Sequence, residues 1–100
     1  PHHRFRPDGR NLHMDLPVAP WEAALGSVIA MDLPSGNVKV RIPEGAQSGQ
    51  QLRVRGKGIP GNPPGDLLLE LLVVLPPADS PRARQMYEDM ARHFAFNPRS

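Results

Sequence analysis

Prolines and glycines divide this chain into short segments. Its 100 residues include 13 Pro and 9 Gly. Proline lacks a backbone N–H and fixes φ, and glycine adopts left-handed turns without strain, so both residues tend to end helices and strands. Their density predicts short strands and tight turns, with little room for long helices. A chain of this length forms one small domain of modest stability, which self-association would increase.

Most segments between these breaks alternate apolar and polar residues, the period of a half-buried strand. The pattern predicts strands near 3–6, 12–16, 28–33, 38–42 and 52–55, a turn over 34–37, and a strand end at Pro17. A short helix is predicted over 20–26, packed down through Trp21 and Leu25. Consecutive strands with tight turns indicate a mainly β fold. We expect a small two-sheet antiparallel β-sandwich with this one short helix and a C-terminal amphipathic helix.

The segment from Leu67 to Leu75 is apolar at almost every position and is interrupted only by Glu70. A strand of this kind is either covered on both faces or meets a partner with its second face. The segment is far too short to span a bilayer, so no membrane association is expected.

The last part of the chain predicts a helix set apart from the sheet by Pro76 and Pro77. Ser80 suits the N-cap position and Pro81 the first helical position. Apolar side chains then recur at helical spacing at Ala83, Met86, Tyr87, Met90, Ala91 and Phe94. We therefore divide the chain into a sandwich at 1–77 and a helix with its tail at 78–100. From the pattern alone, packing on its own sheet and dimerisation are equally good accounts of this stripe.

Basic residues form the second candidate site. Cations alternate with apolar residues on two predicted strands, and if those strands pair they share one exposed patch with a nearby lysine: Lys39, Arg41, Arg53, Arg55 and Lys57. Such a patch could meet DNA phosphates or an acidic peptide. The favoured alternative is an ordinary solvated face, and no aromatic residue interleaves with these cations to stack on bases.

Motifs for catalysis or metal binding are missing from the sequence. It has no Cys, and its four His form no H-E-x-x-H motif. No serine lies in a G-x-S-x-G context, and Asp66 with Glu70 is best explained as a solvated carboxylate pair. We therefore expect no catalytic residues, no metal and no cofactor, and a protein that is not an enzyme.

Five segments, in order and at the expected spacing, resemble the C-terminal region of DnaJ-type (Hsp40) co-chaperones. They are F-R-P-D-G-R-N-L at 5–12, P-W-E-A-A-L-G at 20–26, I-P-E-G-A-Q-S-G-Q at 42–50, L-R-V-R-G-K-G-I-P at 52–60 and G-D-L at 65–67. The first departs from the usual pattern because Asn11 stands where Asp is common. The lead-in at 19–21 and the closing 96–99 are most similar to the bacterial curved-DNA-binding J-domain branch. Because the chain begins at Pro1 rather than Met, we expect it to be cut from a longer protein.

The resemblance implies the second β-domain of such a protein together with its dimerisation helix. It implies a homodimer joined through Met86, Tyr87, Met90 and Phe94. The implied substrate is unfolded polypeptide, and the implied partner of the full-length protein is Hsp70, in the cytoplasm. DNA, with nucleoid association, is the alternative partner. Leu68 and Leu72 are the predicted substrate contacts, because Leu67, Leu69, Leu71 and Val73 are expected to face the core. A covered central strand is the competing account. The resemblance also implies a structural role for the prolines and glycines of the loops. They are expected to shape the sandwich rather than bind a ligand: Pro43, Gly45, Gly49, Gly56 and Gly58.

Overall fold

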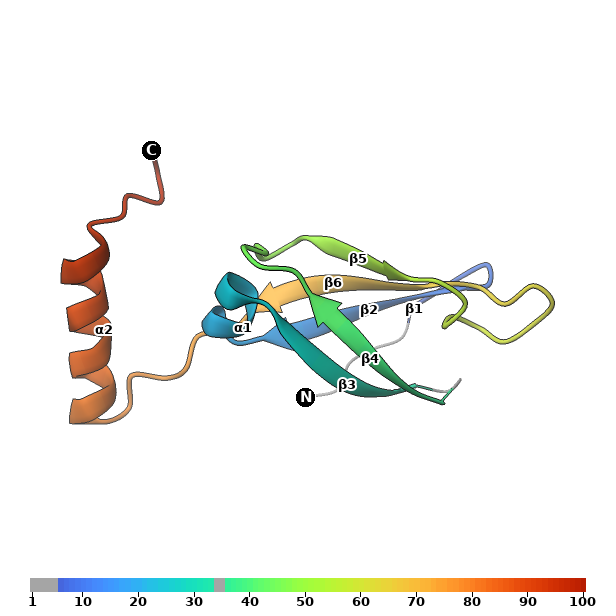
Figure 1. Cartoon of the computed structure of the whole chain (residues 1–100), viewed down its shortest axis with the longest axis horizontal. Helices are drawn as coiled ribbons and strands as arrows, with labels where there is room; N and C mark the ends of the chain where they lie inside the picture. Colours follow the sequence, from blue (N-terminus) through green and yellow to red (C-terminus); the bar gives the residue numbers. More distant parts are fainter. Residues whose placement is uncertain (1–5, 34–35) are drawn as a thin grey trace.

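Two β-sheets stacked face to face form the body of the protein, and one helix stands beyond their end (Figure 1). The computed structural model describes residues 6–33 and 36–100. The predicted strand at 3–6 and turn at 34–37 therefore lie partly outside the described residues. Along the chain the elements are β1 (Arg6–Asp8), β2 (Asn11–Val18), α1 (Pro20–Leu25), β3 (Ser27–Leu33), β4 (Gly36–Ile42), β5 (Gln51–Val54), β6 (Leu67–Val73) and α2 (Pro81–Phe94).

The predicted mainly β, two-sheet sandwich with two helices is confirmed, but not every strand pair is antiparallel. One sheet has the order β1-β2-β6-β5, and the other contains β3 and β4. Strands β2 and β6 run parallel, from Leu12 opposite Leu67 to Val18 opposite Val73. Parallel neighbours need a long crossover. Here the crossover contains α1, the β3–β4 hairpin and β5, which carry the chain back to the start of the sheet.

The core lies between the two sheets and is entirely apolar among the described residues. Leu67, Leu69 and Leu71 have no exposed surface, as predicted for the inward face of β6. The other sheet contributes the same alternation, with Val40 and Ile42 inward on β4. Val73, also predicted to face the core, is half-buried and packs against it.

Proline 17 does not end β2, contrary to expectation. The strand continues to Val18, and Pro17 pairs with Leu72 of β6. Among the described residues, β1 pairs with β2 from Asn11 to His13. The Leu12 N–H donates to the Asp66 carbonyl oxygen on the β6 side, and N–H groups alternate sides along a strand. The nitrogen of Pro17, five positions on, therefore faces away from β6, so the proline removes no hydrogen bond from that ladder.

In the loop between β5 and β6, glycine is required where the backbone packs closely against other backbone atoms. The Ile59 N–H donates to the Arg10 carbonyl oxygen at 2.8 Å. A Cβ on Gly65 would lie 1.7 Å from that same oxygen, and a Cβ on Gly58 would lie 2.4 Å from the Asp66 carbonyl oxygen. Both positions have space for a hydrogen atom only, which agrees with a structural role for Gly58.

Helix α2 extends from the end of the sandwich rather than folding onto it (Figure 1). Its start follows the predicted chemistry: the Ser80 Oγ accepts a hydrogen bond from the Ala83 N–H at 3.0 Å, and Pro81 occupies the first turn. The radius of gyration is 16.6 Å, whereas a compact chain of this length has about 13 Å. No helix among the described residues is long and apolar enough to cross a membrane.

Candidate functional site

The predicted dimer residues of α2 lie together on one exposed face. Ala83, Met86, Tyr87, Met90 and Phe94 follow the spacing of an amphipathic helix. None of the residues of α2 is buried. The exposed fractions are 58% for Met86, 48% for Met90 and 66% for Phe94. The helix therefore has an apolar stripe, defined here by these five residues, that its own chain leaves largely uncovered.

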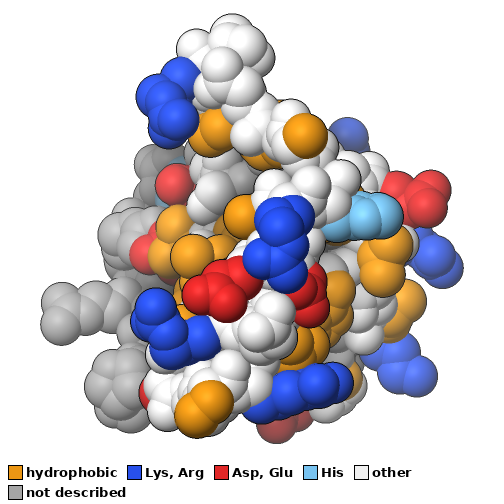
Figure 2. Space-filling model, turned by 90° about the vertical axis from the view of Figure 1, so that its left-hand side faces the viewer, with side chains coloured by type: hydrophobic (Ala, Val, Ile, Leu, Met, Phe, Trp, Pro, Cys, Tyr) orange, Lys and Arg blue, Asp and Glu red, His pale blue; other side chains and the backbone are white. Residues whose placement is uncertain are grey.

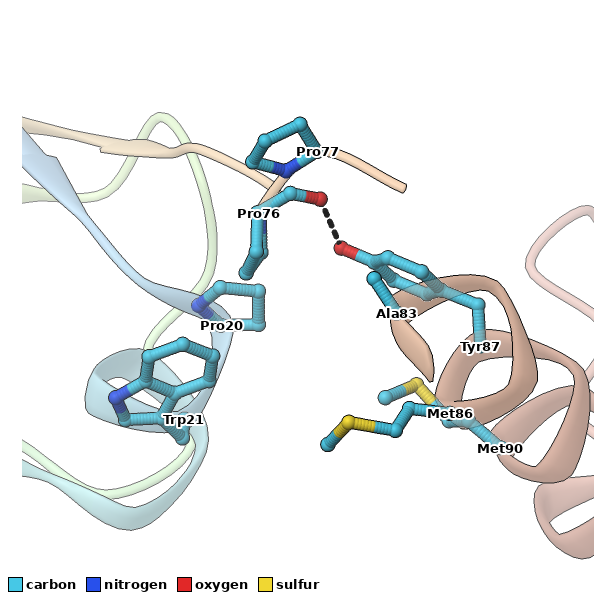
Figure 3. Close-up of a pocket in the computed structure, with 8 residues that line it drawn as sticks. All are labelled: Pro20, Trp21, Pro76, Pro77, Ala83, Met86, Tyr87 and Met90. Atoms are coloured by element: carbon cyan, nitrogen blue, oxygen red, sulfur yellow. Dashed lines mark hydrogen bonds between the residues drawn. The ribbon is translucent and has the colours of Figure 1, made fainter. Parts of the chain in front are cut away.

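An apolar groove separates the stripe from the sandwich. Its volume is about 250 Å³, and Figure 3 shows the α2 side chains pointing across it toward α1. The lining residues come from α1, the linker and α2: Pro20, Trp21, Pro76, Pro77, Ala83, Met86, Tyr87 and Met90. The Tyr87 hydroxyl donates a hydrogen bond to the Pro76 carbonyl oxygen. This bond and the two restricted prolines hold the helix away from the sheets while keeping its stripe turned toward them.

Trp21 is the member of this site that the sequence interpretation missed. It was expected to pack inward with Leu25, but the two side chains are 57% and 71% exposed. The small Ala23 faces the core instead, and its carbonyl accepts from the Ala46 N–H at 2.9 Å. Positions 21 and 25 share one side of the helix and position 23 lies on the other. Seating α1 closely on Ala23 therefore turns Trp21 and Leu25 outward.

The outward side of α2 differs in character from the groove. Figure 2 looks onto this end of the molecule and shows Lys or Arg next to Asp or Glu, with hydrophobic side chains among them. On this helix Arg92 pairs with Asp89, and the Gln85 amide donates to the same carboxylate at 2.9 Å. Side chains on the outward side of α2 thus bond one another, whereas the apolar side chains of the stripe remain largely exposed.

The predicted basic residues do not form one patch through strand pairing. Strands β4 and β5 belong to different sheets, so the pairing on which a shared patch depended does not occur. Lys39 and Arg41 are exposed and alternate with buried residues of β4. Arg53 alternates with inward residues of β5, so it points away from the core on the other side of the sandwich. Arg55 is exposed and Lys57 is half-buried beyond the end of β5.

Arg53 is also committed to an internal contact. Its guanidinium donates to an Asp66 carboxylate oxygen at 2.5 Å, and the Gly56 N–H donates to the other oxygen at 2.9 Å. The Gly56 hydrogen bond, followed by the hydrogen bond and charge of Arg53, lowers the pKa of Asp66 below its ordinary value of 3.8. Through its bond to Gly56 this carboxylate fastens the loop after β5 to the start of β6. The Asp66 backbone N–H in turn donates to Asn11 Oδ1 of β2 at 2.8 Å.

Leu68 and Leu72, the predicted substrate contacts, lie on the outer face of the four-stranded sheet. Both are half-buried. Leu68 lies between His13 of β2 and Arg53 of β5. Glu70 separates the two leucines along the strand. The face is therefore mixed in polarity, unlike the continuous apolar surface of the groove.

Nothing in the described part of the chain assembles a reactive centre. No group of three His, Cys, Asp or Glu side chains there could hold a metal ion. The two carboxylates considered from the sequence have different surroundings, because Asp66 is held by Arg53 and Gly56 whereas Glu70 lies on the outer face of β6.

Comparison with family models identifies the family of the sandwich. The family model of the DnaJ C terminal domain matches residues 1–76. The chain belongs to the DnaJ C-terminal domain family. This is a chaperone-type family rather than a family of enzymes.

Curated relatives of this DnaJ C-terminal domain also cover α2. A "Curved DNA-binding protein" of Coxiella burnetii (strain RSA 493 / Nine Mile phase I) is 37% identical over 99% of the chain. Proteins with the same name from Pseudomonas putida (strain W619) and Serratia proteamaculans (strain 568) are 41% and 39% identical over 100% and 99% of the chain. The chain spans 32% of the length of the first two and 33% of the third, about a third in each case.

The Asp66 cluster generates a prediction about acid stability. Because folding lowers the pKa of Asp66, its ionised form adds stability above the unfolded pKa, and this contribution is lost as pH falls through the folded value. We expect Asp66→Asn to be less stable than the wild type at neutral pH and to lose less stability between about pH 5 and pH 2. Urea-unfolding midpoints of both proteins across that range measure the difference. Parallel pH curves would contradict the role assigned to Asp66.

Proposed function

We propose that this chain is the homodimerising, polypeptide-handling module of a DnaJ-type co-chaperone that supports Hsp70-assisted folding. The observation that carries the proposal is the uncovered stripe of α2. The family and the presence of α2 within the aligned range of the relatives support it. Contact with Hsp70 is proposed for a full-length protein, because the chain spans only about a third of the length of its relatives.

The exposed stripe has a cost that a second copy would remove. Full burial of a large apolar side chain contributes about 1.5–3 kcal/mol. Met86, Met90 and Phe94 each have about half or more of this surface exposed, so covering them would contribute a few kcal/mol. An isolated helix shorter than about 12–15 residues is marginal in water, and α2 has 14 residues. Pairing of two stripes would stabilise both helices.

Unfolded polypeptide is the proposed substrate because the molecule presents apolar side chains outside the stripe as well. Leu68 and Leu72 offer two half-buried contacts on the outer face of the four-stranded sheet. Val28 of β3, on the outer face of the other sheet, is 53% exposed. An extended client would meet short apolar contacts separated by polar groups, which suits weak and reversible binding.

DNA binding is the second candidate function, favoured by the name of the relatives. Each is described as a curved DNA-binding protein. In this chain the cations that fit the role best are Lys39 and Arg41, which are exposed two positions apart on β4. Arg53 is less suited because its guanidinium pairs with Asp66. A few phosphate contacts of this kind would give weak binding that depends strongly on salt.

The dimer is tested by placing a charge on the stripe. Phe94→Asp is expected to raise the dimer dissociation constant by about 100-fold or more, because an unpaired carboxylate would be buried in an apolar interface. Sedimentation equilibrium over a concentration series measures the change. Gln85→Asp is the matched control, because it adds the same charge to the same helix on the polar side, opposite the stripe. A wild-type chain that stays monomeric throughout, or equal effects of the two variants, would contradict the proposal.

The two ligands are separated by their response to salt. We expect a labelled unfolded polypeptide to bind with little salt dependence and to lose affinity on Leu68→Ser/Leu72→Ser. If duplex DNA binds, its affinity should fall steeply with salt, and Lys39→Ala/Arg41→Ala should reduce the logarithmic slope by about 2. Fluorescence anisotropy measures both. Absent or salt-insensitive duplex binding would remove the DNA candidate, and unchanged polypeptide binding by the leucine variant would remove the assigned contact face.

A further inference from the structure

The stripe of α2 is too small to form a typical stable interface alone. A standard interface uses about 20–30 residues from each partner. Helix α2 contains 14 residues, and its stripe contributes only five of them. A dimer built through this helix therefore needs additional surface next to the stripe. The adjoining surface is the groove, whose far wall is Trp21 and Pro20 of α1.

We propose that Trp21 is an anchor of the dimer interface, and that the groove between α1 and α2 receives a side chain from the α2 stripe of a second copy. This inference rests on the proposed homodimer and adds a residue and a surface from the sandwich itself. Trp21 is 57% exposed, and tryptophan is among the side chains most enriched at the energetic centre of interfaces. Its exposure places a large apolar group at the edge of an uncovered apolar surface.

The shape and chemistry of the groove fit such a side chain. A cavity of about 150 Å³ lined by apolar groups holds a benzene ring, so the groove volume of about 250 Å³ admits a phenylalanine or methionine side chain. None of the residues that line the groove is charged. The site therefore offers no ion pair to a phosphate backbone or to a charged peptide.

Continuity with the stripe favours a second copy over other occupants. Met86, Tyr87 and Met90 belong to the stripe and also form one wall of the groove (Figure 3). A partner helix that covers this stripe necessarily lies along the mouth of the groove. In a two-fold dimer the contact is reciprocal, so each copy contributes one inserted side chain and one groove. Both Trp21 side chains are then buried against the partner, which links each sandwich directly to the opposite helix.

The chain contains a single tryptophan, so its fluorescence reports on Trp21 alone. The experiment follows Trp21 emission and acrylamide quenching of the full chain across a dilution series, together with sedimentation equilibrium of the wild type, Trp21→Ala and Leu25→Ala. Leu25→Ala is the control because Leu25 is equally outward on α1 but lines a different hollow, with Val28 and Arg41. We expect the dimer to have blue-shifted, less quenchable emission, and Trp21→Ala to weaken dimerisation by about 10- to 30-fold. Leu25→Ala should change it less than about threefold.

The results that would contradict this inference also show whether the proposed homodimer fails with it. A wild-type dimer with emission independent of concentration, and with Trp21→Ala dimerising normally, would overturn the role of Trp21 and leave the homodimer intact. Absence of any wild-type dimer would overturn the proposed homodimer and this inference together. Emission that shifts only when an unfolded polypeptide is added would assign the groove to substrate, which also overturns the inference.

Discussion

Burial of the alternate leucines of β6 is the interaction on which the rest of the structure depends. Leu67, Leu69 and Leu71 are fully buried where the two sheets meet, and β6 is held on one side by parallel β2 and on the other by antiparallel β5. Three such side chains contribute on the order of 5–9 kcal/mol, comparable to the net stability of a small domain. The loop after β5 is tied to the start of this same strand through Asp66.

This core is complete without α2, and that completeness has a consequence for function. Among the described residues, the buried apolar ones all lie within the sandwich, from Leu12 to Leu71, and none belongs to α2. A restricted linker then places the apolar stripe of the helix opposite Trp21, with a groove between them. The sandwich thus acts as a support that presents an uncovered apolar surface at one end, which is the arrangement expected of a module that functions through a partner.

Local patterns in the sequence predicted the elements well, and long-range relations poorly. Alternation identified β4, the nearly continuous apolar run identified β6, and Ser80, Pro81 and the helical spacing identified α2. The parallel pairing of β2 with β6 and the separation of β4 from β5 depend on how the chain crosses between sheets, which no local pattern encodes. Trp21 was assigned inward because a helix this short must pack against the rest of the domain. The two-residue offset of Ala23 from both Trp21 and Leu25 could have indicated the opposite orientation.

Amide hydrogen exchange of α2 as a function of protein concentration tests the central claim most directly, namely that a second copy covers the stripe. We predict that the backbone amides of 84–94 are protected at high concentration and exchange progressively faster on dilution, whereas those of β6 are unaffected. Exchange in α2 that does not change with concentration, whether fast or slow, would contradict the account. The helix would then be either uncovered in solution or stabilised within its own chain.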